Sequence, residues 1–395
     1  MNLFRLGINI YMKKICFLVE SIFSFGGVQR VTAVIAKALA KDYDVTIVTF
    51  DDPSTKDTSF YDLQEADIHY RFLKFPPTNR LKATCCKAYS ALYKKILPQN
   101  RLTSDWYAHS SFPSEKRDAL VQELLEGHYD TVIGVHAPLA VRLATCKSYL
   151  GDTQLIGWIH NSYEALFGKN SLYIGHELRE HYEYQLEKLH HTIVLCQYDA
   201  RQYHFPTTVI YNPLTLVPGS LSTGNSKKFL AVGRFSRQHK GFDLLIKAFH
   251  LFARQHNDWT LDIVGEGVEE SLYRQMITEY GLQDRITIHP FTNDIQTYYS
   301  NAQVYVLSSR WEGFGLVLVE AMAHGLPVVS SDLPTSKEIM GDFGLYFENG
   351  NVEQLAQRLH QATLLEWHEK SSEALRIARK YDITQIIKQW KNIIL

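Results

Sequence analysis

Short apolar segments alternate along the chain with longer segments in which apolar residues recur every three or four positions. From Lys14, the pattern predicts a strand over 15–19, a loop containing Gly26 and Gly27, a helix over 28–40 and a second strand over 44–50. This order of strand, helix and strand is typical of doubly wound α/β domains with a parallel sheet. The chain therefore begins with a predicted Rossmann-like unit.

The same pattern starts again in the second half of the chain. A strand ends at Gly233, a basic loop and a helix from about Gly241 follow, and the next strand ends at Val264. The segments "RITIH", "AQVYVLSS" and "LPVVSS" are further short apolar strands, and they extend this half to about Asn349. The sequence therefore predicts a second Rossmann-like unit.

A segment rich in Pro, Gly and Ser separates the two units and indicates a domain boundary. We expect an N-terminal Rossmann-like domain over 1–205, a linker over 206–226 and a C-terminal Rossmann-like domain over 227–380. Residues 381–395 are expected to form a helix that packs back on the N-terminal domain, and residues 1–11 are an extension without an assigned role. Because such sheets bind ligands at the carboxyl ends of their strands, two facing domains would bring two binding edges together across a cleft.

Composition narrows the class of protein. With 395 residues, of which 45% are hydrophobic, the chain can bury a core in each domain, and its formal net charge of −1 gives no overall attraction to nucleic acid. The five cysteines lack CxxC spacing, so neither a disulfide framework nor a zinc site is predicted. The start of the chain lacks the features of a signal peptide, and no apolar run reaches about 18 residues. We therefore expect a cytoplasmic protein without a membrane span.

Two basic residues flank the loop that follows the strand ending at Gly233. Arg234 comes directly after this strand, and Lys240 lies six residues later at the edge of the next helix. A guanidinium offers a planar fork to phosphate oxygens and an ammonium offers a point charge, so the two residues could bind one anion. On these two residues alone, a solvated basic loop remains an equal alternative.

The segment "EGFGLVLVEAMAHG" places a carboxylate inside an otherwise apolar helix. The glycines at 313 and 315 allow a ligand to approach the backbone closely, and the free N–H groups of a helix starting near Leu316 favour phosphate. Glu320 lies roughly 7 Å further along at about 1.5 Å per residue, a reach that suits the ribose of a nucleotide. The alternative is a structural ion pair with an Arg or His such as His324, but the second carboxylate, Glu312, favours a sugar diphosphate.

Together these residues resemble a known family. Glu312 and Glu320 match the E-x7-E motif of retaining glycosyltransferases of family four, which have the GT-B fold of two facing Rossmann-like domains. The resemblance extends from "FGGVQR" through "WIHNS" and "VGRFSRQHKGFDLLIKAF" to the C-terminus. It implies transfer of a hexose from a nucleotide-diphosphate sugar, with a UDP-hexose as the expected donor, to a glycan or lipid-linked acceptor in bacterial surface polysaccharide assembly. The acceptor would bind the N-terminal domain and the donor the C-terminal domain.

The resemblance also implies roles for individual residues. Arg234 and Lys240 would bind the diphosphate, Glu320 the ribose and Glu312 the hydroxyls of the donor sugar. The family's base-contacting loop falls at Phe291 and Thr292 by position rather than by motif. The backbone of a further loop would hold phosphate, and it comprises Phe314, Gly315 and Leu316.

Glycines and histidines at strand ends are the candidates in the first half. Gly26 and Gly27 follow the first strand, where a backbone can meet phosphate, although glycine pairs are often simple turns. The resemblance implies a role for this loop at the donor diphosphate. His160 ends the strand in "LIGWIHNS", a place where a histidine is more often structural, and the resemblance implies a hydrogen bond from it to the donor sugar. His136 competes for this role but matches the family less closely. His160 therefore joins Glu312, Arg234 and Lys240 as a predicted catalytic residue, and Gly27 joins the donor-binding set.

A basic segment over 71–101 stands out in the first half. Residues 68–104 contain no acidic side chain, and the basic ones alternate with Phe, Tyr, Leu and Ile. A basic amphipathic element of this kind can lie on an anionic membrane surface, so we expect peripheral attachment to the inner face of the plasma membrane. A solvated helix face is the alternative, and no motif supports nucleic acid. The basic residues are Arg71, Lys74, Arg80, Lys82, Lys87, Lys94, Lys95 and Arg101.

No metal and no cofactor is expected. Asp42 and Asp44 have the DxD spacing of metal-dependent glycosyltransferases, but they lie in the turn into the second strand, at the opposite end of the unit from the glycine loop. Arg234, Lys240 and a helix N-terminus could stabilise the departing diphosphate without a metal. The resemblance implies retention at the anomeric carbon through a front-face mechanism, and a short-lived double displacement remains an alternative.

Three other functions compete with this hypothesis. A sugar-nucleotide epimerase of related fold would bind the same donor but would release a changed sugar without an acceptor. A non-catalytic partner or activator of another glycosyltransferase would be suggested by loss of the motif residues, and all of them are present here. An NAD-dependent dehydrogenase would need the G-x-G-x-x-G fingerprint, and "VGEGVEE" supplies only Gly265 and Gly267.

Overall fold

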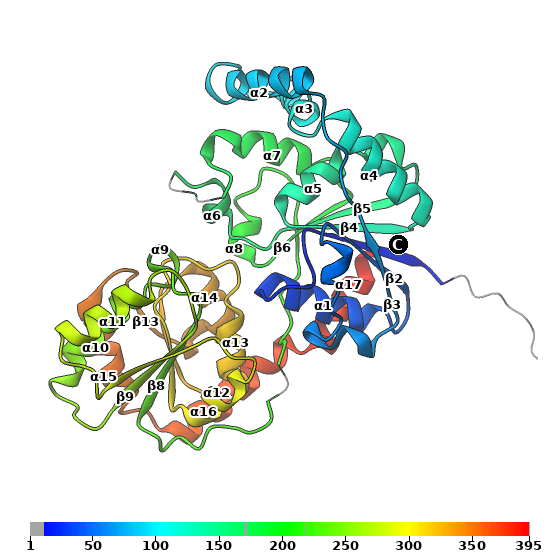
Figure 1. Cartoon of the computed structure of the whole chain (residues 1–395). Coiled ribbons are helices and arrows are strands. Elements are labelled where there is room, and N and C mark those ends of the chain that lie inside the picture. Colours follow the sequence, from blue (N-terminus) through cyan, green and yellow to red (C-terminus); the bar gives the residue numbers. More distant parts are fainter. Residues whose placement is uncertain (1–11, 170, 172, 217, 395) are drawn as a thin grey trace, which may run out of the picture.

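The computed structural model describes residues 12–169, 171, 173–216 and 218–394 and contains two lobes, each built on one parallel sheet (Figure 1). The extension predicted over 1–11 lies outside the described residues. The first lobe carries a seven-stranded sheet in the order β3-β2-β1-β4-β5-β6-β7. Its strands are β1 (Lys14–Val19), β2 (Asp44–Thr49), β3 (Ile68–Phe72), β4 (Thr131–Val135), β5 (Gln154–Trp158), β6 (His191–Val194) and β7 (Thr208–Val209).

The second lobe carries a six-stranded sheet in the order β10-β9-β8-β11-β12-β13. Its strands are β8 (Lys228–Val232), β9 (Thr260–Val264), β10 (Ile286–His289), β11 (Val304–Leu307), β12 (Val328–Ser331) and β13 (Leu345–Phe347). The inner strands of both lobes are rich in Val and Ile and are almost wholly buried, as expected where helices cover both faces of a parallel sheet, whereas the edge strands β3, β7, β10 and β13 are only partly buried. The two predicted Rossmann-like units are therefore confirmed.

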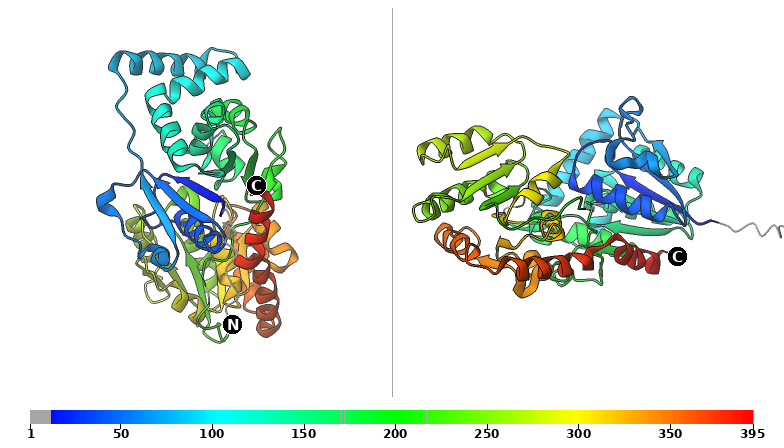
Figure 2. Two further views of the ribbon diagram at one scale, coloured as in Figure 1. Left: turned by 90° about the vertical axis from the view of Figure 1, so that its right-hand side faces the viewer. Right: turned by 90° about the horizontal axis from the view of Figure 1, so that it is seen from below.

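Helices connect the strands and cover both faces of each sheet (Figure 1). The helices of the first lobe are α1 (Gly27–Leu39), α2 (Arg80–Lys95), α3 (Arg101–Ser111), α4 (Ser114–Gly127), α5 (Ala137–Ala144), α6 (Tyr163–Phe167), α7 (Arg179–Leu186) and α8 (Gln197–Ala200). The helices of the C-terminal half of the chain are α9 (Arg237–Lys240), α10 (Phe242–Ala253), α11 (Glu270–Glu279), α12 (Ile295–Asn301), α13 (Leu316–Ala323), α14 (Pro334–Met340), α15 (Val352–Ala362), α16 (Trp367–Ala378) and α17 (Ile383–Ile393). In the left view of Figure 2, α2 and α3 lie at the edge of the first lobe.

The strand order of each sheet defines where a ligand can bind. Counted within each lobe, the first six strands of both sheets follow the order 3-2-1-4-5-6, which reverses direction between the first and fourth strands, and the seventh strand of the first lobe lies beyond the sixth. These reversal points lie between β1 and β4 in the first lobe and between β8 and β11 in the second. The loops after such strands diverge and leave a crevice at their carboxyl ends, where doubly wound sheets bind ligands.

The last helix, α17, returns to the first lobe and packs against α1 (Figure 1). Trp390 on α17 is fully buried, and its ring centroid lies 4.7 Å from that of Trp158 at the end of β5. The ammonium of Lys391 lies 2.6 Å from a carboxylate oxygen of Asp42. One cluster of buried apolar side chains runs through both lobes and includes Trp390. The C-terminus of the chain therefore helps to hold the two lobes together.

Truncation of Trp390 should destabilise the whole protein. Trp390→Ala removes a fully buried indole, and such a change in a core costs about 3–5 kcal/mol. We expect a clear fall in the midpoint of urea unfolding monitored by circular dichroism. Trp106→Ala, at an exposed position of α3, is the matched control and should shift the midpoint little. Equal midpoints for Trp390→Ala and the wild type would contradict the proposed role of α17.

Candidate active site

The loops at the two reversal points carry most of the residues singled out in the sequence. Gly26 and Gly27 follow β1, and His136 follows β4. In the second lobe, Arg234 follows β8 and Glu312 lies in the loop after β11. The strand order thus gathers residues from four separate parts of the chain, as a ligand-binding crevice requires.

The loops of the two lobes approach each other closely at this point. A Cβ atom placed on Gly313 would lie 2.3 Å from the carbonyl oxygen of His160, so only a glycine fits between the second lobe and the end of β5. A Cβ on Gly27 would lie 3.6 Å from a side-chain carbon of Leu316. The N-termini of α1 and α13 therefore face each other across the interface between the lobes.

Lys240 and Glu312 form a buried ion pair in the second lobe. The ammonium of Lys240 lies 2.5 Å from Oε1 of Glu312, and the hydroxyl of Ser309 donates a hydrogen bond of 2.6 Å to the same oxygen. Only 8% of Glu312 is exposed. Burial by itself raises the pKa of Glu312, but Lys240 and His239 outweigh burial and hold this pKa well below its usual range. The structure thus joins two of the predicted residues, and Glu312 is ionised at neutral pH.

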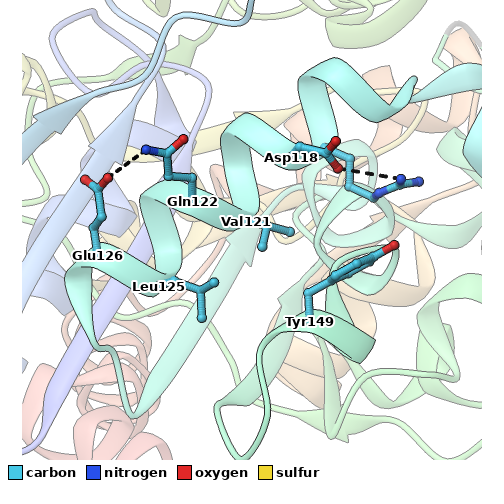
Figure 3. A pocket seen from close by; sticks show the side chains of 7 residues that line it. Asp118, Val121, Gln122, Leu125, Glu126 and Tyr149 are labelled. Carbon is cyan, nitrogen blue, oxygen red and sulfur yellow. Dashed lines mark hydrogen bonds and ion pairs between the residues drawn. The ribbon is translucent and has the colours of Figure 1, made fainter.

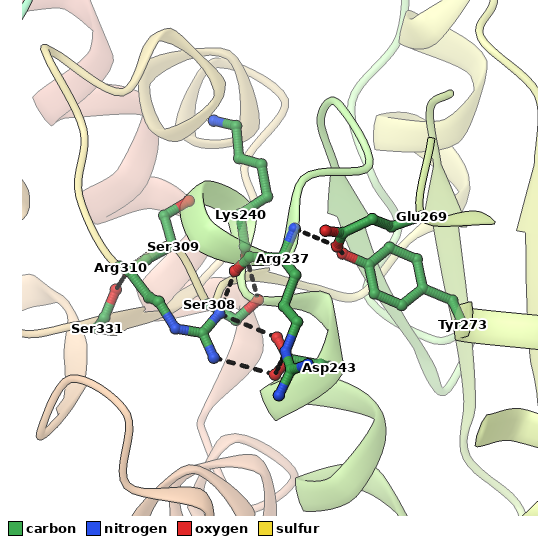
Figure 4. A network of polar contacts seen from close by, with 9 residues as sticks. All are labelled: Arg237, Lys240, Asp243, Glu269, Tyr273, Ser308, Ser309, Arg310 and Ser331. Atoms are coloured by element: carbon green, nitrogen blue, oxygen red, sulfur yellow. Dashed lines mark hydrogen bonds and ion pairs between the residues drawn. The ribbon is translucent and has the colours of Figure 1, made fainter. Parts of the chain in front are cut away.

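A second ion-pair network holds the segment that carries Lys240 (Figure 4). The guanidinium of Arg310 binds both carboxylate oxygens of Asp243, at 2.9 and 3.0 Å, and Arg237 binds the same carboxylate at 3.3 Å. The hydroxyl of Ser308 donates to the carbonyl oxygen of Lys240. These contacts fasten the loop after β11 to the start of α10. This network was not predicted, because no local sequence pattern pairs Arg310 with Asp243.

Glu320 has its partners on three different segments. Its carboxylate forms an ion pair with Arg30 of α1, accepts a hydrogen bond of 3.1 Å from the hydroxyl of Thr215 and accepts another of 3.0 Å from the hydroxyl of Tyr299. His324 instead contacts the backbone carbonyl of Glu320 at 2.7 Å. The ion-pair alternative is therefore realised, with Arg30 of the opposite lobe as the partner rather than His324. Arg30, Thr215 and Tyr299 were all missed in the sequence, although Arg30 belongs to "FGGVQR".

Arg234 is exposed and lies near Tyr173: burial raises the pKa of the Tyr173 phenol, and the positive charge of Arg234 opposes part of this rise. Tyr173 contacts Trp311, with ring centroids 5.7 Å apart, and Trp311 stacks on His239 at 3.7 Å. Arg234 is thus exposed near a group of contacting aromatic rings, Tyr173, Trp311 and His239, that joins the two lobes.

Phe291 is exposed and contacts Phe25 of the first lobe, with ring centroids 5.1 Å apart. The hydroxyl of Thr292 accepts a hydrogen bond from the backbone of Asp294 and so shapes the same loop. Phe25 directly precedes the glycine pair and also contacts Phe60. The segment predicted to contact a base thus lies against the glycine loop of the other lobe.

The two histidines of the first lobe lie side by side. The ring centroids of His136 and His160 are 5.4 Å apart. Burial, and then the neighbouring His136, lower the pKa of His160 well below its usual range, so its imidazole is neutral at pH 7. Its Nε2 atom is buried and has no hydrogen-bond partner among the described residues. Such an atom is a candidate for hydrogen bonding to a ligand.

A cavity of about 170 Å³ opens beside His136. His136 has a φ of 75°, a conformation that is uncommon outside glycine and persists only where the surrounding structure holds it. The hydroxyl of Thr32 is buried there without a partner among the described residues. The cavity is lined by Val19, Glu20, Ser21, Val28, Gln29, Thr32, Val135 and His136. The first lobe therefore offers a polar cavity next to the glycine loop.

A larger cavity of about 540 Å³ lies elsewhere, between α4 and the short helix Lys147–Tyr149 (Figure 3). Tyr149 and Leu125 contribute to its lining, and Arg117 packs over the ring of Tyr149. Because this short helix precedes β5, the cavity lies toward the amino ends of the strands, where doubly wound sheets do not bind ligands. Asp42 and Asp44, the DxD pair, also lie at an amino end, before and at the start of β2. No cluster of three potential metal ligands is found among the described residues.

The chain is similar in sequence to known glycosyltransferases. Residues 217–381 match the family described as "Glycosyl transferases group 1". An uncharacterised glycosyltransferase of Haemophilus influenzae is 29% identical over 396 residues, covering 97% of this chain and all of the relative. The amylovoran biosynthesis glycosyltransferase AmsD of Erwinia amylovora is 31% identical over 170 residues, covering 42% of this chain and 48% of the relative.

Solved structures agree on the fold. The crystal structure of Anabaena Alr3699/HepE in complex with UDP and glucose superposes with a TM-score of 0.71 at 21% identity, covering 96% of this chain and 98% of the other. The fold is thus that of the GT-B glycosyltransferases, and this prediction is confirmed. Residues 217–381, which form most of the second lobe, are thus those of a group 1 glycosyltransferase, an enzyme that transfers a sugar from a nucleotide sugar. The predicted family and enzyme class are confirmed, and the roles of individual site residues stay predictions.

The low pKa of Glu312 predicts that the free energy of unfolding depends on pH. A carboxyl whose pKa is lowered by folding contributes stability that is present above its unfolded value, about 4.3, and is lost as the pH falls toward the folded value. We therefore expect the free energy of unfolding of the wild type to fall more steeply between about pH 5 and pH 3 than that of Glu312→Gln, measured by urea unfolding. Glu353→Gln, at an exposed position of α15, should keep the wild-type slope. Identical slopes for the wild type and Glu312→Gln would contradict this assignment.

Proposed function

We propose that this chain transfers a hexose from a UDP-hexose, with retention, to a hydroxyl of a glycan or lipid-linked acceptor in bacterial surface polysaccharide assembly. The observation that carries the proposal is the meeting of two helix N-termini, the Lys240–Glu312 pair and Glu320 at the reversal points of both sheets. Amylovoran synthesis by one relative and the UDP complex of one structural neighbour support the acceptor class and the donor nucleotide.

In this proposal the donor diphosphate lies between Gly27 and the N-terminus of α13. The backbone N–H groups over 314–316 and the charges of Arg234 and Lys240 would bind its oxygens. Lys240 would then turn from Glu312 to phosphate, and Glu312 would accept hydrogen bonds from hydroxyls of the sugar. Phe291 and Thr292 would border the base, and Glu320 would bind the ribose.

The reaction breaks the bond between the anomeric carbon and the diphosphate and forms a bond to the acceptor oxygen. The positive groups around the diphosphate stabilise the departing oxyanion, so we propose that no metal is needed. Since Glu312 and Glu320 are both assigned to donor binding, we favour a front-face route in which the departing phosphate takes the acceptor proton. His160, which is neutral, would donate to or accept from a hydroxyl of the donor sugar.

The acceptor hydroxyl would enter from the first lobe. The cavity beside His136 contains a carboxylate, an amide and an unpartnered hydroxyl, and such groups suit a polyhydroxylated ligand. We therefore propose that residues 1–205 bind the acceptor, that 206–226 form the linker and that 227–380 bind the donor. Helix α17 of the C-terminal segment packs against α1, which belongs to the proposed acceptor-binding domain.

Donor binding can be tested with a panel of nucleotide sugars in thermal unfolding. A ligand at about 100 times its dissociation constant stabilises the folded state by about 2.7 kcal/mol, so a UDP-hexose should raise the melting temperature. Glu320→Ala should lose this rise, whereas Glu353→Ala should keep it. The donor assignment would be contradicted if no nucleotide sugar raised the melting temperature of the wild type and if Glu320→Ala responded to the panel in the same way as the wild type.

Hydrolysis of the bound donor tests the absence of a metal. We expect the rate of UDP release to be the same with and without excess EDTA, and strong inhibition by the chelator would contradict the metal-free reaction. Release of a changed nucleotide sugar without any acceptor would favour the epimerase instead.

We further propose that α2 and α3 attach the protein to the cytoplasmic face of the plasma membrane. Large apolar side chains are exposed here: 80% of Leu81 and 74% of Ile96 are accessible, and Leu92, Leu102 and Trp106 are also exposed. Three of the basic side chains form ion pairs with glutamates of the first lobe, namely Arg71, Lys82 and Arg101. Lys74, Arg80, Lys87, Lys94 and Lys95 are exposed. Among the described residues, no helix is long and apolar enough to cross a membrane.

Vesicle flotation tests this surface. Each basic residue near an anionic bilayer contributes about 1 kcal/mol, so the triple variant Lys87→Glu, Lys94→Glu and Lys95→Glu should bind phosphatidylglycerol vesicles about a hundredfold more weakly. Ile96→Ser should also weaken binding, whereas Leu364→Ser, at an exposed position of the second lobe, should not. Binding that ignores the content of anionic lipid would contradict the proposal.

A further inference from the structure

Arg30 and Glu320 join the two lobes at equivalent places on two facing helices. Arg30 lies in the first turn of α1, where its N–H donates to the carbonyl of Gly26 at 3.0 Å. Glu320 lies about one turn into α13, which begins after Gly315. The N-termini of both helices border the proposed diphosphate position, so this ion pair lies beside the proposed ribose position.

The partners of Glu320 leave little room for a ribose. An ionised carboxylate offers about four acceptor positions. Arg30 and Thr215 contact Oε1, and Tyr299 contacts Oε2, so three of these positions are taken. Two ribose hydroxyls need two positions, and only 2% of Glu320 is exposed. At least one of the three partners must therefore yield when a ribose binds.

Charge and burial decide which partner yields. Removing Arg30 would leave a buried carboxylate without its counter-charge, which costs more free energy than losing a hydrogen bond from a neutral hydroxyl. The hydroxyl of Tyr299 is held in place, because its ring is fully buried and stacks on His324 with centroids 4.9 Å apart. Thr215 is only partly buried and lies in the segment between the lobes. If a ribose hydroxyl takes the place of the Thr215 hydroxyl, one hydrogen bond from a neutral hydroxyl to Glu320 is replaced by another of the same kind.

We propose that Arg30 is a positioning residue for the donor ribose, and that Thr215 is the partner that the ribose replaces. Arg30 neutralises Glu320 and orients its carboxylate while the ribose hydroxyls bind. Because Arg30 belongs to the first lobe and Glu320 to the second, ribose binding then depends on contact between the lobes. This inference rests on the proposed donor site.

Binding of UDP and of 2′-deoxy-UDP, measured by isothermal titration calorimetry, tests the proposal. We expect Arg30→Met to bind UDP at least tenfold more weakly than the wild type and to lose most of the preference for UDP over 2′-deoxy-UDP. Arg30→Lys should recover much of this preference, because it restores the charge. Thr215→Val should bind UDP within threefold of the wild type, and Arg274→Met, at an exposed position of α11, should bind as the wild type does.

A second comparison covers the case in which Arg30→Met does not fold. If Arg30 acts through Glu320, adding Arg30→Met to a Glu320→Gln protein should change UDP affinity by less than twofold, and the double variant contains no unpaired buried charge. A larger change would overturn the proposed route of action.

Three further outcomes would overturn the inference. Wild-type affinity and preference in Arg30→Met would show that Arg30 has no positioning role, and tighter UDP binding would show that Arg30 competes with the ribose instead. A tenfold loss in Thr215→Val would show that Thr215 does not yield. Failure of the wild type itself to bind UDP would contradict the donor assignment as well, so the two failures can be told apart.

Discussion

The need of two buried carboxylates for positive partners organises the centre of this molecule. Glu312 and Glu320 lie at either end of the same glycine-containing segment, and both are almost completely removed from solvent. Glu312 is paired within its own lobe, with Lys240, whereas Glu320 is paired across the interface, with Arg30. Since a buried carboxylate is costly without a counter-charge, these pairs constrain the loops after β8 and β11 and the approach of the first lobe.

The strand order explains why these partners can meet. Both sheets reverse direction between their first and fourth strands, so the loops after β1, β4, β8 and β11 collect at two facing edges. The glycines on either side remove side chains that would hold the edges apart, as the close approach of Gly313 to the carbonyl of His160 shows. The hydrophobic cluster that runs through both lobes and includes Trp390 also holds the two lobes together.

The two lobes differ in the kinds of side chain that they place at their surfaces. The second lobe concentrates charge near one glycine loop, in keeping with a family whose members share the use of nucleotide sugars. The first lobe presents a polar cavity, two neighbouring histidines and, at its edge, exposed apolar and basic side chains on α2 and α3. These polar and exposed groups are the reason that we propose the first lobe as the acceptor-binding side.

The sequence by itself determined the two Rossmann-like units and the places of most strands, and it identified Lys240, Glu312 and Glu320 as candidate site residues. These features follow from hydrophobic periodicity and from the spacing of residues that are close in the sequence. Only the tertiary structure decided the partners. Arg30 and Glu320 are 290 positions apart, and Arg310 and Asp243 are 67 apart. No local pattern links such residues, since their contact arises from the strand order and from the closeness of the lobes. The cavity beside His136 likewise exists only where β1, α1 and β4 meet in space.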